Sequence, residues 1–515
     1  MPVVSGRWKC RPPSLRKTVV VASVVLALIA VSPWTFTART PVADRPPEPA
    51  QRAQPAPLPA AAPAFDFTAV SKLMNDAIAA DGLPGGVVVV GHGGNVVFHQ
   101  AYGLRKLAGE PGLDGSPAPA EPMTEDTIFD MASLTKCLAT AVAIMQLYEQ
   151  GKVAFDDPVQ KYLPDFNTTN DPRRAQVTVR MLLTNTSGEG IDVSLADPWG
   201  LGGPDKAEGI HRALSTPLQS GPGELFRYSD INYILLGALL EKATGEAEDT
   251  YVQRNVFAPL GLQDTRYLPV AKACGPHVVR GAAVAWAPGT TGGACPAGAW
   301  DTGLLPRIAP TARDEESRDD PSKNPDYYAL LRGTVHDPTA RRMGGVAGNA
   351  GMFSTAQDAG VFAQALLDRL AGRPSEFPLR PETLAMMTAP QQPGHTAEQV
   401  AAANRAAGRS QTPTYPAIEG QSLFGFGWDI DTAFSRPRGT VFPVGSFGNT
   451  GFTGTTLWMD PGSNTYVILL SNSIHLRGSP PISHLRGAVA TAAAQALHLY
   501  GAPSPESAPG PRKSR

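Results

Sequence analysis

The sequence carries two hairpin patterns with strong β propensity, and they lie near opposite ends of the chain. The first is GGVVVVGHGGNVVFHQAYG at 85–103, where two apolar, β-branched runs flank a Gly-rich turn. The second is TGTTLWMDPGSNTYVILLSNS at 453–473, with DPGSN as its turn. Because strands open and close this region, we expect one sheet built from both chain ends, with a helical insertion between them.

Helical patterns fill the insertion. SLTKCLATAVAIMQLYEQG at 133–151 is apolar at helical spacing and ends in a glycine suited to a C-cap. TVRMLLTNTSG at 178–188 predicts a short helix with Thr178 as N-cap. Residues 228–260 indicate two helices split by a TGE turn, and a last helix is expected at about 483–499.

Composition separates the two ends of the chain from its body. Residues 1–17 carry five basic residues and no acid, and the apolar run TVVVASVVLALIAVSPW follows within 18–35. This pattern predicts an exported protein, with 18–35 either a cleaved signal peptide or a retained membrane anchor. A Pro/Ala-rich linker is expected over 36–65, a disordered Pro/Ser-rich tail over 501–515, and the globular domain over 66–500.

If the protein is exported, the basic flank stays in the cytoplasm and the globular domain lies outside it, in the periplasm or anchored to the inner membrane. Long loops at 189–220, 270–330 and 390–420 exceed what a compact domain needs, so some should line or cover a site.

Bulk composition excludes several classes of function. The formal net charge is -2 and the body has no long single-sign run, which argues against a nucleic-acid partner. The nine His are scattered and no CxxC occurs, so neither a metal site nor a cofactor is expected. Cys274 and Cys295 flank a Gly/Ala/Pro-rich segment and could form a disulfide in an oxidising compartment, with two free thiols as the alternative.

Ser133 and Lys136 stand three residues apart in MASLTKCLAT at 131–140. If a helix starts here, the two side chains share a face, one turn apart. The serine then gains from the positive helix end, and a desolvated lysine can be neutral enough to accept its proton. The pair predicts a nucleophile and its base. Two ordinary helix residues are the alternative, since Ser14 and Lys17 have the same spacing.

Two further segments would complete such a site. PGELFRYSDINYILLG at 222–237 puts Tyr228 on a turn before an apolar helix, and a tyrosine beside a cationic lysine can act as general base. A core or capping tyrosine is the alternative. GNTGFTGTTLWM at 448–459 combines small residues with a β run, which predicts a strand that lines the cleft and supplies an oxyanion N–H.

In this order the segments resemble the serine β-lactamase and penicillin-binding-protein superfamily, in particular its class C β-lactamase-like and esterase branch. The family motifs S-x-x-K, Y-x-N and (K/H)-T-G correspond to SLTK at 133–136, YSD at 228–230 and NTG at 449–451. The likeness spans roughly residues 80–475, and GTVHDPTARRMGGVAGNAGMFSTAQD at 333–358 is similar to bacterial hydrolases likened to D-alanine carboxypeptidases.

The resemblance implies an α/β/α sandwich with an antiparallel sheet plus an all-helical domain, with the active-site cleft between them. It implies that Ser133 attacks a carbonyl and forms an acyl-enzyme that water releases. Lys136 and Tyr228 would share the proton transfers, and the backbone N–H groups of Ser133 and Phe452 would form the oxyanion hole. The implied substrate-binding residues are Asp230, Asn449, Thr450 and Gly451.

Two positions depart from the family pattern. Asp230 stands where class C sequences have Asn, and an ionised Asp accepts but does not donate hydrogen bonds. Asn449 stands where Lys or His is usual, so recognition of a D-Ala-D-Ala or β-lactam carboxylate is less secure. As alternatives, Asp230 could merely cap the following helix, and Asn449 could be a plain turn residue.

We therefore expect an exported serine hydrolase that acts on an ester or amide of a small molecule or peptide, with cell-wall peptides among the candidates. An esterase or D-amino-acid peptidase ranks above a true β-lactamase. A non-catalytic envelope binding protein is the alternative of another class. His336 and Asp337 are interpreted as structural rather than as triad members, because lysine and tyrosine already fill that role.

Overall fold

In the computed structural model, the described residues from 65 to 502 form one compact unit. Its described residues are 65–287, 294–407, 413–478 and 481–502. The predicted signal or anchor at 18–35 lies outside them, as do nearly all of the linker and the tail. Within these described ranges no helix is long and apolar enough to cross a membrane.

An eight-stranded antiparallel sheet lies at the centre of the unit, in the order β11-β12-β13-β14-β15-β1-β2-β3. The first predicted hairpin is β1 (Gly85–His92) with β2 (Asn95–Lys106), and the second is β14 (Thr456–Asp460) with β15 (Thr465–Ser471). β1 also pairs with β15, so the expectation of one sheet from both chain ends is confirmed. The other strands are β3 (Glu121–Pro122), β11 (Leu423–Phe424), β12 (Asp429–Asp431) and β13 (Phe447–Thr450).

The central strands are apolar on both faces because both faces are covered. In β1, Val87 and Val89 belong to one hydrophobic core, whereas Val88 and Val90 belong to a second core on the opposite face. This alternation follows from the two-residue period of a strand. A strand with one solvated face would instead alternate apolar and polar residues.

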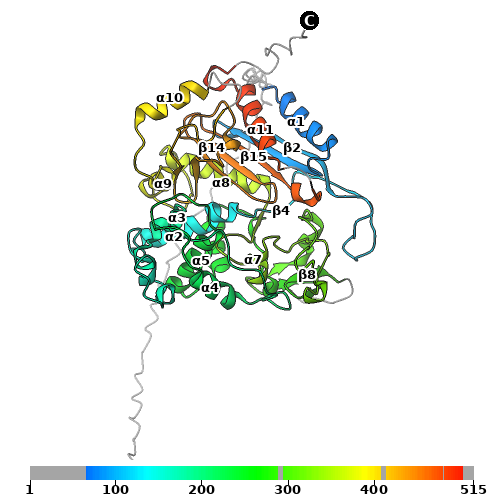
Figure 1. Cartoon of the computed structure of the whole chain (residues 1–515). Coiled ribbons are helices and arrows are strands. Elements are labelled where there is room, and N and C mark those ends of the chain that lie inside the picture. Colours follow the sequence, from blue (N-terminus) through cyan, green and yellow to red (C-terminus); the bar gives the residue numbers. More distant parts are fainter. Residues whose placement is uncertain (1–64, 288–293, 408–412, 479–480, 503–515) are drawn as a thin grey trace, which may run out of the picture. The chain divides into compact units, whose positions relative to one another are not determined.

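Helices form the outer layers of this sandwich. α1 (Thr68–Ala79) and α11 (Ser483–Ala496) contact each other and cover the face of Val88 (Figure 1). α8 (Ala356–Leu370) contacts β1, β14 and β15 on the other face, and α9 (Pro381–Thr388) packs on α8. The predicted α/β/α sandwich with an antiparallel sheet is therefore confirmed.

The insertion supplies a second, mainly helical region. Its helices are α2 (Ala141–Glu149), α3 (Val179–Leu183), α4 (Lys206–Ser215), α5 (Asp230–Thr244), α6 (Glu248–Val252) and α7 (Pro338–Arg342). Thr178 caps α3 as predicted, through a hydrogen bond from the Met181 N–H. Gly245 ends α5 with a φ of 72°, which a TGE turn allows.

Short strands complete the fold. β4 (Phe129–Asp130), β5 (Arg266–Tyr267) and β10 (Met352–Ser354) make a small antiparallel sheet next to the nucleophile turn. Two strand pairs lie in the predicted loop 270–330: β6 (Ala273–Cys274) with β9 (Trp300–Asp301), and β7 (His277–Arg280) with β8 (Ala283–Trp286). Cys274 and Cys295 are joined by a disulfide there, with Cα atoms 5.6 Å apart.

Two predicted loops contain helices, which the sequence interpretation missed. α4 lies within 189–220 and α10 (Ala397–Ala407) within 390–420. α4 carries Gly209, a residue that weakens a helix in isolation. In the folded chain that glycine packs under Met343, where a Cβ would lie only 2.4 Å from the Met343 Cγ. Tertiary packing therefore overrides the local preference.

Glu248, at the start of α6, is a buried acid in the helical core. The Thr140 Oγ1 lies 2.7 Å from the Glu248 Oε1 and 2.7 Å from the Gly348 carbonyl oxygen. One hydroxyl can donate to only one of these oxygens, so a neutral Glu248 that donates to Thr140 satisfies both contacts. Burial raises the pKa of Glu248 to about 7, which agrees with a protonated side chain.

We predict that Glu248→Gln stabilises the protein at alkaline pH only. The stability contributed by neutral Glu248 is fully present below pH 4.5, the ordinary pKa of this group, and is lost as pH rises through about 7. Glutamine keeps the donor without titrating, so the variant should match the wild type at pH 4 and gain ~3 kcal/mol at pH 8.5. Circular-dichroism melting curves at both pH values check this, with exposed Glu382→Gln as control. A variant less stable at both pH values would contradict it.

Candidate active site

Ser133 lies on a strained turn directly after β4. Ala132, the residue before it, has a φ of 47°, in the left-handed region that residues other than glycine rarely adopt. The buried Asp130 carboxylate holds this turn, because it accepts the Ala132 N–H at 2.9 Å and the His336 N–H at 2.7 Å. Ser133 remains partly exposed at the end of the turn. Such strain is typical of functional sites.

Lys136 begins a π-helical turn, Lys136–Thr140, that leads into α2. Its side chain is 1% exposed, yet the Nζ atom has three oxygen partners. These are the Ser133 Oγ at 2.9 Å, the Asn349 carbonyl oxygen at 3.0 Å and the Asp230 Oδ1 at 2.6 Å. The three-residue spacing therefore brings serine and lysine together, as the sequence predicted.

Tyr228 approaches Ser133 from the other side. Its Oη lies 2.7 Å from the Ser133 Oγ, and the Lys136 Nζ lies 5.0 Å from its ring centroid. The loop around Asn185 fixes this placement, since the Asn185 carbonyl oxygen accepts the Arg227 N–H and its side chain accepts the Ser229 N–H. The tyrosine thus faces the serine and is not merely a core or capping residue.

The capping alternative for Asp230 is wrong. Ser229 is the N-cap of α5, through a hydrogen bond from the Asn232 N–H to its Oγ. Asp230 lies in the first turn instead, with its carboxylate against the Lys136 ammonium. An aspartate at this position therefore acts first on the lysine, which the sequence alone did not indicate.

Charge at the site follows from this ion pair. Burial by itself would lower the pKa of Lys136, but the Asp230 carboxylate and the neighbouring Tyr228 raise that pKa above its usual value. With the Asp230 carboxylate 2.6 Å from its Nζ, Lys136 is placed as a cation, whereas the sequence predicted a neutral lysine base. Burial raises the pKa of Tyr228, and the Lys136 charge offsets part of this rise. Near neutral pH Tyr228 is therefore a phenol that donates to the Ser133 Oγ, and it can accept the serine proton once it has ionised to the phenolate.

The third motif lies on β13 and the turn that follows. The Asn449 side chain, 8% exposed, donates to the Gly427 carbonyl at 2.9 Å and accepts the Thr450 N–H at 2.8 Å. Both ends of this amide therefore bind main chain. Asn449 lies within β13, opposite Leu457, and so it is not the plain turn residue of the alternative. Thr450 is partly exposed at the end of β13. A Cβ on Gly451 would lie 2.5 Å from the Met131 carbonyl oxygen, so only glycine permits this close approach.

Two N–H groups are available to an oxyanion at this junction. Among the described residues, neither the Ser133 N–H nor the Phe452 N–H donates a hydrogen bond. Two threonine hydroxyls tie the segments together, since Thr453 donates to the Asp130 carbonyl at 2.7 Å and Thr455 donates to the Met131 carbonyl at 3.1 Å. The arrangement agrees with the predicted oxyanion hole, whose role stays a prediction.

The structure places two further acids at the site: Asp192, which the sequence analysis missed, and Asp337, which it interpreted as structural. Asp192 and Asp337 lie near Asp230, and burial raises their pKa values to about 8 and about 6, helped by mutual repulsion with neighbouring carboxylates. Asp192 accepts from the Thr339 hydroxyl at 3.0 Å, and Asp337 caps α7 by accepting the Ala340 N–H. No local motif marks Asp192, because its partner Thr339 lies 147 residues away in the sequence.

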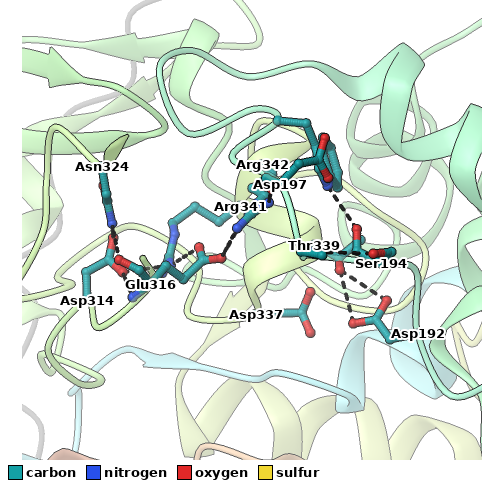
Figure 2. A network of polar contacts seen from close by, with 12 residues as sticks. Asp192, Ser194, Asp197, Asp314, Glu316, Asn324, Asp337, Thr339, Arg341 and Arg342 are labelled. Atoms are coloured by element: carbon teal, nitrogen blue, oxygen red, sulfur yellow. Dashed lines mark hydrogen bonds and ion pairs between the residues drawn. The ribbon is translucent and has the colours of Figure 1, made fainter. Parts of the chain in front are cut away.

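Buried arginines hold α7 against these loops. Arg341 pairs with Asp314 at 3.0 Å, and Arg342 pairs with Glu316 at 2.8 Å (Figure 2). Arg342 also donates to the Asp197 carbonyl, so the loop that carries Asp192 is attached to the same helix. His336 precedes this helix and its ring stacks on Phe452, with centroids 5.8 Å apart. This supports its structural interpretation.

The Cys137 thiol is poorly suited to act as a nucleophile. Cys137 is fully buried, and burial raises the pKa of its thiol well above the ordinary value. Among the described residues, no group of three or more His, Cys, Asp or Glu is arranged to hold a metal ion.

A sequence model of the family described as Beta-lactamase matches residues 70–490. The chain belongs to this family. A protein of Escherichia coli (strain K12) named "Putative D-alanyl-D-alanine carboxypeptidase" is 30% identical over 393 residues, 74% of this chain and 76% of that protein. An N-acetylmuramyl-L-alanine amidase of Bacillus subtilis (strain 168) is 29% identical over 416 residues, 79% of this chain and 80% of that protein.

Solved structures of similar fold agree with this membership. The octameric penicillin-binding protein homologue from Pyrococcus abyssi superposes with a TM-score of 0.53 at 20% identity, over 86% of this chain and 79% of that chain. This likeness concerns the fold. The motif order of the beta-lactamase family and the geometry around Ser133 together identify the chain as a serine hydrolase of this family.

We predict that Asp230→Asn moves the pH profile of Ser133 acylation to lower pH. Asp230 raises the pKa values of both Lys136 and Tyr228, so its neutralisation lowers both. A shift of roughly one pH unit is expected for loss of one adjacent charge. The rate of Ser133 labelling by a fluorophosphonate, measured from pH 6 to 10, checks this. Asp249→Asn, which breaks the Lys272 pair away from the cleft, is the control. An unshifted profile would contradict the role of Asp230.

Proposed function

We propose that this protein hydrolyses amides or esters of D-amino-acid-containing peptides through an acyl-enzyme on Ser133. One observation carries the proposal: the Ser133 Oγ lies within hydrogen-bond distance of both the Lys136 Nζ and the Tyr228 Oη. A serine whose Oγ contacts a cation and a tyrosine that becomes a base when it ionises is a poised nucleophile.

The reaction has two steps, acylation of Ser133 and hydrolysis of the acyl-enzyme. The Ser133 Oγ attacks the substrate carbonyl while its proton passes to the phenolate form of Tyr228, which becomes a phenol, and the Lys136 cation stabilises the negative charge of the site. The oxyanion is received by the N–H groups of Ser133 and Phe452. Collapse expels the leaving amine or alcohol, which takes the proton from Tyr228. Water then attacks the acyl-enzyme along the same path and releases the acid.

Two features support a peptide substrate. The named relatives in E. coli and B. subtilis are described as a carboxypeptidase and an amidase. A cavity of about 450 Å³ adjoins Phe452, large enough for a peptide extension, and Arg313, His475 and Arg477 are among its lining residues. Arg477 is 65% exposed, although it pairs with Glu315 at 3.3 Å.

A true β-lactamase ranks lower. Asn449 carries no charge, and its amide already binds main chain on both sides. A β-lactam carboxylate therefore lacks the cationic partner that the usual Lys or His of this motif supplies. Penicillin is for that reason the discriminating probe.

We expect a fluorophosphonate to add one phosphonyl group to Ser133 of the full-length protein, with loss of fluoride and no adduct on Ser133→Ala. Intact-mass spectrometry checks this. Tyr228→Phe should slow p-nitrophenyl acetate hydrolysis by about 100-fold, as loss of a general base does. A stable penicilloyl adduct would favour cell-wall peptides as substrates, whereas Ser133-dependent turnover of nitrocefin would favour a β-lactamase. Absence of any Ser133-dependent adduct would contradict the acyl-enzyme and favour a binding protein.

We further propose that the domain is exported. The basic segment at 1–17 and the apolar run after it support this, as does the Cys274–Cys295 disulfide, since disulfides persist in oxidising compartments. Fractionation of the producing cell should place a C-terminally tagged chain outside the cytoplasm. A chain recovered with cytoplasmic markers, with both thiols free to alkylation, would contradict export.

A further inference from the structure

An arginine contacts the back of the peptide group that presents the Phe452 N–H. Arg486, on α11, donates from its Nη2 to the Gly451 carbonyl oxygen at 2.7 Å. That carbonyl and the Phe452 N–H belong to the same trans peptide group, so they point in opposite directions. A donor that holds the carbonyl therefore also sets the direction of the N–H.

The rest of this peptide is fixed as well. The Gly451 N–H donates to the Thr455 carbonyl at 2.8 Å, so the residue is held on both sides. Gly451 also packs against the nucleophile turn, where a Cβ would lie 3.2 Å from the Ala132 Cβ. The same carbonyl also accepts the Gly454 N–H at 3.2 Å, a longer contact than the one with Arg486. Rotation of the peptide away from the site would break both contacts.

The charge of Arg486 has no carboxylate partner among the described residues. Its Nε is buried without a hydrogen bond, and burial lowers the pKa of the guanidinium to about 10, so it remains a cation at neutral pH. A cation bonded to the carbonyl oxygen polarises the amide and strengthens its N–H as a donor. An ion-paired arginine would have less of this effect.

We propose that Arg486 is a positioning residue of the oxyanion hole, which aims and polarises the Phe452 N–H through the Gly451 carbonyl. This rests on the proposed acyl-enzyme function of Ser133. During attack, the bond between the Ser133 Oγ and the substrate carbon forms, the carbonyl π electrons move to its oxygen, and the serine proton passes to Tyr228. The full negative charge exists only in this step, so Arg486 acts on kcat rather than on KM.

The test compares Arg486→Met, which removes the donor and the charge, with Arg486→Lys, which keeps both. Both are made in the full-length protein and measured with p-nitrophenyl acetate. Loss of an oxyanion-hole donor costs about 100- to 1000-fold in kcat. For loss of its support we expect a fall of about 10- to 100-fold in Arg486→Met, KM within about threefold of wild type, and at least partial recovery in Arg486→Lys. His484→Met, an exposed change on the same helix, should leave kcat and KM unchanged.

A second variant and a labelling experiment distinguish the remaining outcomes. If Arg486→Met fails to fold, as judged by its melting curve, Arg486→Gln takes its place, because glutamine is a neutral donor and should show an intermediate kcat. An unchanged kcat, or a rise in KM that alone accounts for the loss, would overturn the role of Arg486. If the wild type takes up no fluorophosphonate on Ser133, the proposed function fails instead, whereas equal labelling rates of wild type and Arg486→Met overturn only this inference.

Discussion

The pairing of β1 with β15 holds the two ends of the domain together, and the position of the site depends on it. The register runs from Gly86 opposite Ser471 to His92 opposite Thr465, with both strands buried on both faces. β14 and β13 follow next to β15, which brings the third motif to the edge of the helical region. Helices on each face then bury the apolar residues of the sheet, so the sheet is a rigid base for the cleft.

At the cleft, Asp230 replaces the asparagine of the family pattern, and this change affects which residue acts as the base. Asp230 binds the Lys136 ammonium, whereas the asparagine usual at this motif position could not neutralise it. A paired lysine donates to the Ser133 Oγ rather than accepting its proton. Tyr228 then takes the role of base. The same acid disfavours a substrate carboxylate close by, in keeping with the uncharged Asn449 on the opposite side of the motif set.

The motif residues could be identified from the sequence because each motif depends on residues only a few positions apart. Serine and lysine at a three-residue spacing meet on any helical turn, and β-branched runs around DPGSN form a hairpin wherever they fold. The contact of Arg486 was not predicted, for the opposite reason. Arg486 binds the carbonyl of Gly451, which lies 35 residues away, and an isolated Arg has no local signature.

The sequence by itself determined the two hairpins, the order of the three motifs and the nucleophile with its lysine, because hydrophobic period and residue spacing act over a few positions. Only the tertiary structure decided the charge state of Lys136, the main-chain role of Asn449 and the support of the Phe452 peptide by Arg486. Each depends on how close two distant segments come, and both desolvation and Coulomb energy depend on that separation and on burial.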